Sequence, residues 1–415
     1  MKILLAHKYM WRGGGTATYL FALIEELERR GQEWVPFTVA YEKTALNTHT
    51  DYFVSPPLAA DVSHYKQMHL SPLSMLKLLG RATYSFEARS KADQLVAATD
   101  PDLAYVHNIY NYMSPSMLHS FAKRKLPVVM RVPDYNMICA ELHFLQHGQM
   151  CTECLHGSYW KAAQHRCLKS SLSASAARAF SMYVHRWMHV YDTVDMFVTP
   201  SAFMRDRLID AGFGGERIVH LQSFYPGQIS EIEEAEEEDY ILYFGRVAPE
   251  KAIDTLIRAS AQLEGGPRVL IAGGDVDGTE TKLRQLADEV GATQVEFVGF
   301  QDRESLDRLI AGSLFTVVPS RWYDNCPMSV LESFAHAKPV VASAVGGIPE
   351  QIAPECGILC EPDDPAALAG AIQTLLADSN LRRSMGQAAR HRLQTHYSPD
   401  LHCDRLLELF EGLIA

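Results

Sequence analysis

A chain of 415 residues with 47% hydrophobic and 21% charged residues buries the cores of two or three domains and is not disordered. The net charge of −12 is unevenly spread: residues 1–230 carry 23 Lys+Arg against 19 Asp+Glu, and residues 231–415 carry 15 against 31. The acidic second part disfavours nucleic acid, whereas the mildly basic first part favours an anionic membrane surface. No apolar run approaches the ~20 residues of a membrane-spanning helix, and residues 1–6 predict a buried strand rather than a signal peptide. We therefore expect a cytoplasmic protein.

Apolar strand-like runs alternate with amphipathic helix-length segments, which predicts βαβ units and parallel sheets. A helix is expected over about 16–30. Strands are expected at 2–6, 33–39, 103–107, 127–132, 196–200 and 218–221, and again at 240–245, 268–273, 296–299, 315–319, 339–342 and 357–360. The predicted fold class is α/β, with two doubly wound Rossmann-like domains that face a cleft.

The two halves are separated by an acidic stretch. Residues 231–239 hold seven acids in nine positions, and such a charge block stays solvated, which is typical of a linker. The sequence thus predicts a first domain over 1–223 with a Cys-rich insertion at 139–167, a linker over 224–239, and a second domain over 240–397. Residues 398–415 predict a last amphipathic helix.

Two carboxylates, Asp324 and Glu332, flank a loop-to-helix junction. Pro327 suits a first helical turn, because its missing N–H has no partner there anyway. The free N–H groups of Met328, Ser329 and Val330 would then point into the preceding cavity as a phosphate site. Glu332 is placed to accept hydrogen bonds from a ribose, and Asp324 to hold a sugar hydroxyl. The alternative is an ordinary capped helix after a buried strand.

Three other segments carry candidate ligand-binding residues. Arg246 and Lys251 project from a turn after a strand, where two cations neutralise a diphosphate; the alternative is a solvated turn. Gly14 and Gly15 follow the first strand and allow close backbone approach, without forming a G-x-G-x-x-G fingerprint. His107 ends a strand and is placed to donate a hydrogen bond or carry a proton, although a lone histidine is more often structural.

These motifs together resemble those of the retaining glycosyltransferases of family 4, which have the GT-B fold. That family normally shows two glutamates where this chain has Asp324 and Glu332, a Gly-Arg…Lys-Gly element where it has Arg246 and Lys251, and His-x-His ending at His107. The resemblance implies transfer of a hexose from a nucleotide sugar, UDP- or GDP-linked. The basic first half of the chain favours a glycan or lipid-linked oligosaccharide as the acceptor, as in bacterial surface-polysaccharide assembly. It also implies a last helix that crosses back onto the first domain.

The same resemblance implies a front-face retaining mechanism, in which the leaving diphosphate assists deprotonation of the acceptor hydroxyl. Arg246, Lys251 and helix N–H groups are expected to hold the diphosphate without a metal ion, and His107 to touch the reacting sugar. Two alternatives stay open: a nucleotide-sugar epimerase or hydrolase on the same fold, and a non-catalytic nucleotide-sugar sensor.

The insertion carries four cysteines, Cys139, Cys151, Cys154 and Cys167, with one pair at C-x-x-C spacing. This pattern suits a tetrahedral structural zinc, and buried free thiols or a disulfide are the alternatives.

Residues 155–191 contain no acid but five cations, with Trp160, Phe180, Tyr183 and Trp187 among them. The segment predicts either a peripheral membrane face or an acceptor-diphosphate site, or else a solvated helix whose aromatic side chains lie in the core.

Overall fold

The computed structural model describes residues 1–11, 15–44, 48–56, 72–227, 229, 236–275 and 277–415. Its first domain is built on a six-stranded sheet of order β2-β1-β3-β4-β7-β8, in which every neighbouring pair is parallel. The strands are β1 (Lys2–His7), β2 (Glu33–Phe37), β3 (Leu103–His107), β4 (Val128–Arg131), β7 (Met196–Thr199) and β8 (Ile218–His220). Strand β3 is buried along its whole length, as expected for a central parallel strand covered on both faces.

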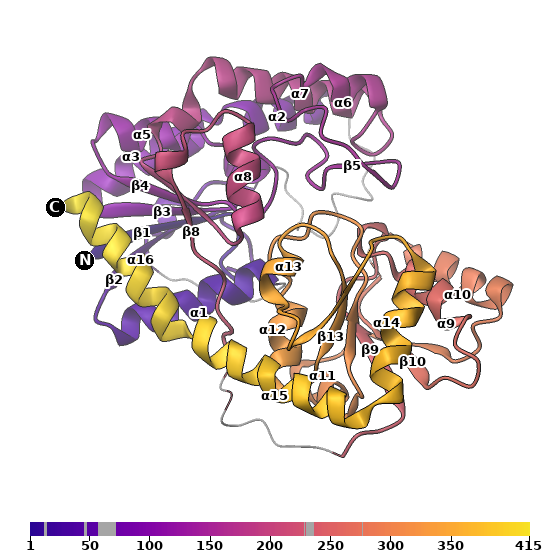
Figure 1. The fold of residues 1–415 in the computed structure, drawn as a ribbon. Coiled ribbons are helices and arrows are strands. Elements are labelled where there is room, and N and C mark those ends of the chain that lie inside the picture. The colour runs from indigo at the N-terminus through magenta and orange to yellow at the C-terminus, as the bar shows by residue number, and fades with distance from the viewer. Residues whose placement is uncertain (12–14, 45–47, 57–71, 228, 230–235, 276) are drawn as a thin grey trace.

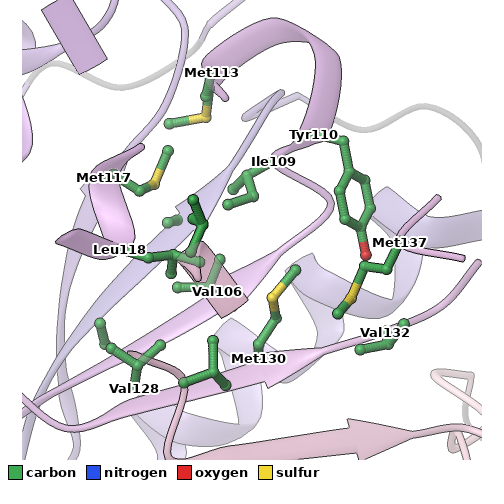
Figure 2. Close-up of a cluster of buried hydrophobic side chains, with 14 of the residues drawn as sticks. Val106, Ile109, Tyr110, Met113, Met117, Leu118, Val128, Met130, Val132 and Met137 are labelled. Atoms are coloured by element: carbon green, nitrogen blue, oxygen red, sulfur yellow. The ribbon is translucent and has the colours of Figure 1, made fainter. Parts of the chain in front are cut away.

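Helices cover both faces of this first sheet. They are α1 (Gly15–Arg29), α2 (Pro72–Thr83), α3 (Phe86–Thr99), α4 (Tyr110–Met113), α5 (Met117–Lys123), α6 (Trp160–His165), α7 (Leu172–Trp187) and α8 (Ala202–Asp210). Figure 2 shows the core on one face, where Val106, Met117, Leu118 and Met130 lie together and are shielded from solvent. The methionines fill the irregular space between the strands and the short helices.

The second domain repeats the plan with a six-stranded sheet of order β11-β10-β9-β12-β13-β14. Its strands are β9 (Tyr240–Phe244), β10 (Arg268–Ala272), β11 (Val295–Gly299), β12 (Thr316–Val318), β13 (Val340–Ser343) and β14 (Gly357–Cys360). Its helices are α9 (Ile253–Ser260), α10 (Thr279–Val290), α11 (Arg303–Gly312), α12 (Met328–Ala335), α13 (Ile348–Gln351), α14 (Pro365–Ala377) and α15 (Ser379–His396). Each strand predicted from the sequence is present in the two sheets, which confirms the predicted fold class.

The last helix, α16 (Pro399–Ile414), leaves the second domain and packs on the first (Figure 1). Its residues Cys403, Leu406 and Phe410 are fully buried in a core cluster shared with β1 and α1. Burying a side chain such as Leu or Phe stabilises a fold by about 1.5–3 kcal/mol, so this face holds the helix firmly on the first domain. The predicted crossover is thus confirmed.

The Cys-rich insertion folds on the first domain. It contains the antiparallel hairpin β5 (Leu145–Gln146) and β6 (Gln149–Met150), and its helix α6 packs against α7. The sequence analysis missed this hairpin because each strand has only two residues, too few to show an alternating pattern. Of the predicted linker, residues 228 and 230–235 lie outside the described part of the chain. None of the described helices has the length and apolarity required to cross a membrane.

Candidate active site

A cavity of about 870 Å³ lies between the two domains and is lined by residues that follow the strands of both sheets. Ligands of doubly wound folds bind at the carboxyl ends of the strands, and this volume is typical of a small-molecule site. The predicted site residues that line the cavity are His107, Arg246, Lys251, Asp324, Met328, Ser329 and Glu332. Gly14 lies outside the described residues, and Gly15 is the first residue of α1. One turn further along α1, Thr18 and Tyr19 line the cavity.

Lys251 and Asp324 form an ion pair, with 2.5 Å between Lys251 Nζ and Asp324 Oδ2. Both side chains are largely buried, and the indole Nε1–H of Trp322 also donates to Asp324 Oδ2. Lys251 ends a short 3-10 turn (Pro249–Lys251) that follows β9, and Ala252 adopts φ 51° there. Asp324 thus positions the ammonium group over the cavity, in addition to the sugar-binding role predicted for it.

Arg246 is the more exposed of the two predicted cations. Its guanidinium pairs with Glu250 at 2.7 Å, and about half of its side chain is accessible to solvent. An arginine held at the rim of the cavity is free to change partner from a carboxylate to a phosphate, since both are bidentate oxyanion acceptors.

Helix α12 begins at Met328, and Pro327 is its N-cap, with φ −61° and ψ 124°. The prediction that Pro327 lies inside the first turn is therefore wrong by one residue, because its extended ψ places it before the helix. The prediction for Val330 is also wrong: its N–H donates to Pro327 O at 3.2 Å, and its side chain is buried in the core rather than lining the cavity. Met328 and Ser329 remain at the helix N-terminus beside the cavity.

Glu332 pairs with Arg303, whose Nη1 lies 2.8 Å from Glu332 Oε1. Burial raises the pKa of Glu332, and the neighbouring guanidinium opposes that rise. Arg303 also donates to the hydroxyl of Tyr225 and pairs with Asp307. The sequence analysis missed Arg303, which lines the same cavity. A ribose bound at Glu332 would therefore share its carboxylate with this guanidinium.

Three polar residues end neighbouring strands at the edge of the first sheet. His107 and Arg131 are paired in register at the ends of β3 and β4, and the rings of His7 and His107 stack with centroids 5.2 Å apart. Burial lowers the pKa of His107 well below its usual value, and His7 and Arg131 lower it further. Burial lowers the pKa of His7 to about 4. Both imidazoles are therefore neutral at pH 7, so His107 is a hydrogen-bonding group rather than a cation.

Glycines allow close approach at the edge of the second sheet. A Cβ on Gly273 would lie 1.8 Å from Gly245 O, so no other residue fits between the ends of β9 and β10. Asp275 follows and lines the cavity. With Asp277 it forms an Asp-x-Asp pair that the sequence analysis did not recognise. Asp275 Oδ1 accepts the N–H groups of Asp277 and Thr279, so this carboxylate closes the turn before α10.

Direct contacts join the two domains around the cavity. The hydroxyl of Tyr135 lies 2.6 Å from Asn325 Oδ1, and Asn325 Nδ2 donates to Pro133 O at 3.0 Å. The Glu350 carboxylate of the second domain accepts the N–H groups of Ala202 and Phe203, both at 2.7 Å, and so caps α8 of the first. A carboxylate at a helix N-terminus is stabilised by the helix dipole. These contacts hold the two domains together beside the cavity.

The four cysteines of the insertion are free thiols, two of them buried. Burial raises the pKa of Cys139 to about 12 and that of Cys167 to about 11. Within the described ranges, no three His, Cys, Asp or Glu side chains converge closely enough to hold a metal ion. Zinc binding at these four cysteines stays a prediction from their spacing.

Comparison with known proteins agrees with this architecture. Residues 14–222 match the glycosyl transferase 4-like domain model, and residues 227–392 match the model of glycosyl transferases group 1. A D-inositol 3-phosphate glycosyltransferase of Salinispora arenicola is 34% identical over 197 residues, which cover 43% of this chain and 42% of that protein. An uncharacterized glycosyltransferase of Methanocaldococcus jannaschii is 32% identical over 40% of this chain and 43% of its own length. The matched region thus spans less than half of these curated relatives.

Solved structures resemble the whole chain. The sucrose-phosphate synthase of Thermosynechococcus elongatus superposes with a TM-score of 0.70 at 19% identity, covering 99% of this chain and 98% of that one. Anabaena HepE in complex with UDP superposes with a TM-score of 0.69 at 17% identity, covering 99% and 100%. At this identity the likeness establishes the fold, and the two family models establish the family. The chain belongs to the glycosyl transferase 4-like family and has the GT-B fold.

Proposed function

We propose that the enzyme transfers a hexosyl group from a nucleotide sugar, UDP- or GDP-linked, to a glycan or lipid-linked oligosaccharide in polysaccharide biosynthesis. The observation that carries this proposal is that Lys251, Arg246 and the first residues of α12 all line the same cavity. Two cations and free helix amides form a site for a diphosphate. Among the structural neighbours, Anabaena HepE is described in complex with UDP-glucose, which supports this class of donor.

In the proposed reaction, the anomeric carbon keeps its configuration. The bond from that carbon to the diphosphate oxygen breaks, and a bond to the acceptor oxygen forms on the same face of the sugar. The acceptor proton moves to an oxygen of the leaving phosphate. Lys251 and Arg246 stabilise the charge that develops on the diphosphate. Asp324 and Glu332 hold donor sugar and ribose, and neutral His107 donates a hydrogen bond to the reacting sugar.

Nucleotide release across UDP-, GDP- and ADP-sugars, with and without a membrane lipid extract, tests the transfer. We expect one donor to release its nucleotide, at a rate that rises with the extract. Release that does not depend on an acceptor would favour a hydrolase or epimerase, and binding without release would favour a sensor.

We also expect the rate of nucleotide release to be unchanged by EDTA, because the two cations and the helix amides replace a metal ion. A rate restored only by added Mg²⁺ would contradict metal-independent transfer.

We further propose that helix α7 contacts a membrane that carries the acceptor. The aromatic side chains of α6 and α7 are not in the core: Trp187 is 80% exposed and Phe180 is 56% exposed. The buried face of α7 instead carries Met182 together with smaller and polar residues, such as Ser181, which shares a hydrogen bond of 2.6 Å with Thr83. Figure 1 shows α2, α6 and α7 along the edge of the first domain that faces away from the second.

The charge around this face suits an anionic lipid surface. Lys161, Arg166, Lys169 and Arg186 accompany the exposed aromatic residues, and residues 155–191 contain no acid. Aromatic side chains with a basic surround are typical of interfacial helices. The alternative in which these aromatic residues form the core is wrong for this structure.

Replacing Phe180 and Trp187 together by serine is expected to weaken binding to phosphatidylglycerol-containing vesicles by at least ~10-fold, because each buried aromatic contributes about 1.5–3 kcal/mol. Co-sedimentation with phosphatidylcholine vesicles, with and without phosphatidylglycerol, measures this binding. Ile414→Ser changes an exposed apolar residue of α16 and serves as the matched control. Equal sedimentation of the double variant and the control would contradict the membrane proposal.

A further inference from the structure

Arg131 is a buried arginine at the base of the cavity, where β4 ends. Only 2% of it is exposed, and it lines the cavity together with Tyr19 and Ser223. Its guanidinium lies 4.0 Å from the centre of the Tyr19 ring, and its Nη2 donates to the Ser223 hydroxyl at 2.8 Å. Its Nη1 is buried and has no hydrogen-bond partner.

No carboxylate of the described residues forms an ion pair with Arg131, in contrast to Arg382 and Arg303. Arg382 is also buried, with 9% of it exposed, but it pairs with Glu237 at 3.3 Å and donates to Leu375 O. Arg303 pairs with Glu332. A cation withdrawn from water without a counter-charge is strongly disfavoured, because a neutral hydroxyl and an aromatic ring replace little of its hydration. An anion from outside the protein would supply the counter-charge that Arg131 lacks.

The groups around Arg131 suit an oxyanion. His107 lies beside it in register, and both of its ring nitrogens are buried without a partner. As a neutral imidazole, His107 supplies one N–H donor without adding charge. Ser223 also lies against Cys326, the residue before Pro327, so Arg131 faces the N-terminus of α12 across the cavity. The hydrogen-bond donors of Arg131 and His107 that have no partner thus lie on the first-domain side of the cavity, and the N–H groups at the start of α12 lie on the second-domain side.

We infer that Arg131, with His107 beside it, binds a phosphate oxyanion of a substrate between the two domains. The inference rests on the proposed function in one respect only, namely that a substrate carries phosphate. Two sources share this chemistry: the phosphate that leaves with the nucleotide, and a phosphate on the acceptor. A bound oxyanion would complete the hydrogen bonding of Nη1 and neutralise the buried guanidinium.

The test replaces Arg131 by methionine, which keeps the length of the side chain and removes its charge. Because an unpaired buried cation is lost, the ligand-free variant is expected to melt at the same temperature as the wild type or higher. The matched control is Arg382→Met, which removes a buried arginine that has a carboxylate partner. That variant is expected to melt at a lower temperature and to keep its response to anions.

Binding is measured by calorimetry in two arms at constant ionic strength. The first arm titrates UDP, GDP and ADP, and the second titrates pyrophosphate and inorganic phosphate onto protein saturated with the nucleotide that binds. Removing a charge-assisted hydrogen bond weakens binding by about 10- to 100-fold. Such a loss in the first arm assigns the anion to the donor, and a loss confined to the second arm assigns it to the acceptor.

Wild-type affinities in both arms of Arg131→Met would overturn the inference. It would also be overturned if ligand-free Arg131→Met were destabilised as strongly as Arg382→Met, because Arg131 would then serve the fold. Turnover of nucleotide sugars by the wild type is a separate measurement. A protein that binds the anion through Arg131 without transferring sugar would therefore refute the proposed function and leave this inference standing.

Discussion

Lys251→Ala is expected to lower the rate of sugar transfer by about 10²- to 10³-fold, the usual effect of losing one donor to a developing negative charge. Lys251 lies at the cavity wall beside the N-terminus of α12, so its ammonium group is the cation best placed to stabilise the leaving diphosphate. Steady-state nucleotide release measures the effect. Circular dichroism is expected to stay close to that of the wild type, and the melting temperature to fall moderately, because Asp324 loses its ion-pair partner.

Two variants make this result specific. Lys282→Ala removes an exposed lysine of α10 in the same domain and is expected to keep the full rate. Asp324→Asn keeps the shape of the ion-pair partner but not its charge. The Asp324→Asn variant is expected to lower the rate of transfer less than Lys251→Ala does, because the carboxylate of Asp324 acts by orienting the ammonium group of Lys251. Near-normal turnover by Lys251→Ala would refute its place at the diphosphate.

Phe410→Ala is expected to destabilise the protein by about 3–5 kcal/mol, the usual cost of truncating a fully buried phenylalanine. Phe410 is inaccessible to solvent, and its ring centre lies 5.5 Å from that of Tyr105 on the central strand β3. The truncation would leave a cavity between α16 and the first sheet. Thermal unfolding measures the loss as a lower melting temperature.

The control for this variant is Ile414→Ala at the exposed end of the same helix. Surface substitutions usually change stability by less than about 0.5 kcal/mol, so the control is expected to melt like the wild type. If Phe410→Ala melted with the control, α16 would be a loosely attached element rather than part of the first domain's core.

The positions of the strands along the chain and the place of the cleft were predictable, because parallel strands buried on both faces appear as continuous apolar runs. Polar residues directly after such runs then lie at one edge of a sheet, and this reasoning placed His107 correctly. The same reasoning applies to Arg131, which ends the neighbouring strand, but the sequence analysis did not extend it there. That signal was available in the sequence.

Other parts of the site were not predictable from the sequence. Arg303 and Glu332 are separated by 29 positions, and only the packing of α11 beside α12 brings them together. The first residue of α12 depends on the ψ angle of Pro327. The proline ring fixes φ but not ψ, so the sequence does not tell whether Pro327 lies inside the helix or just before it. Composition showed that residues 155–191 are basic and aromatic, but it does not tell which face of α7 is covered by α2.

The crossing helix also determines how the cleft can open. The chain passes between the domains near Phe224 and again near Ser398, and the two passages are joined where Tyr225 N–H donates to Tyr397 O at 3.0 Å. Two adjacent chain crossings can serve as a hinge, at which a few residues absorb the change in backbone angles. Opening of the cleft would then pivot near Tyr225 and Tyr397 and separate Arg131 from the start of α12.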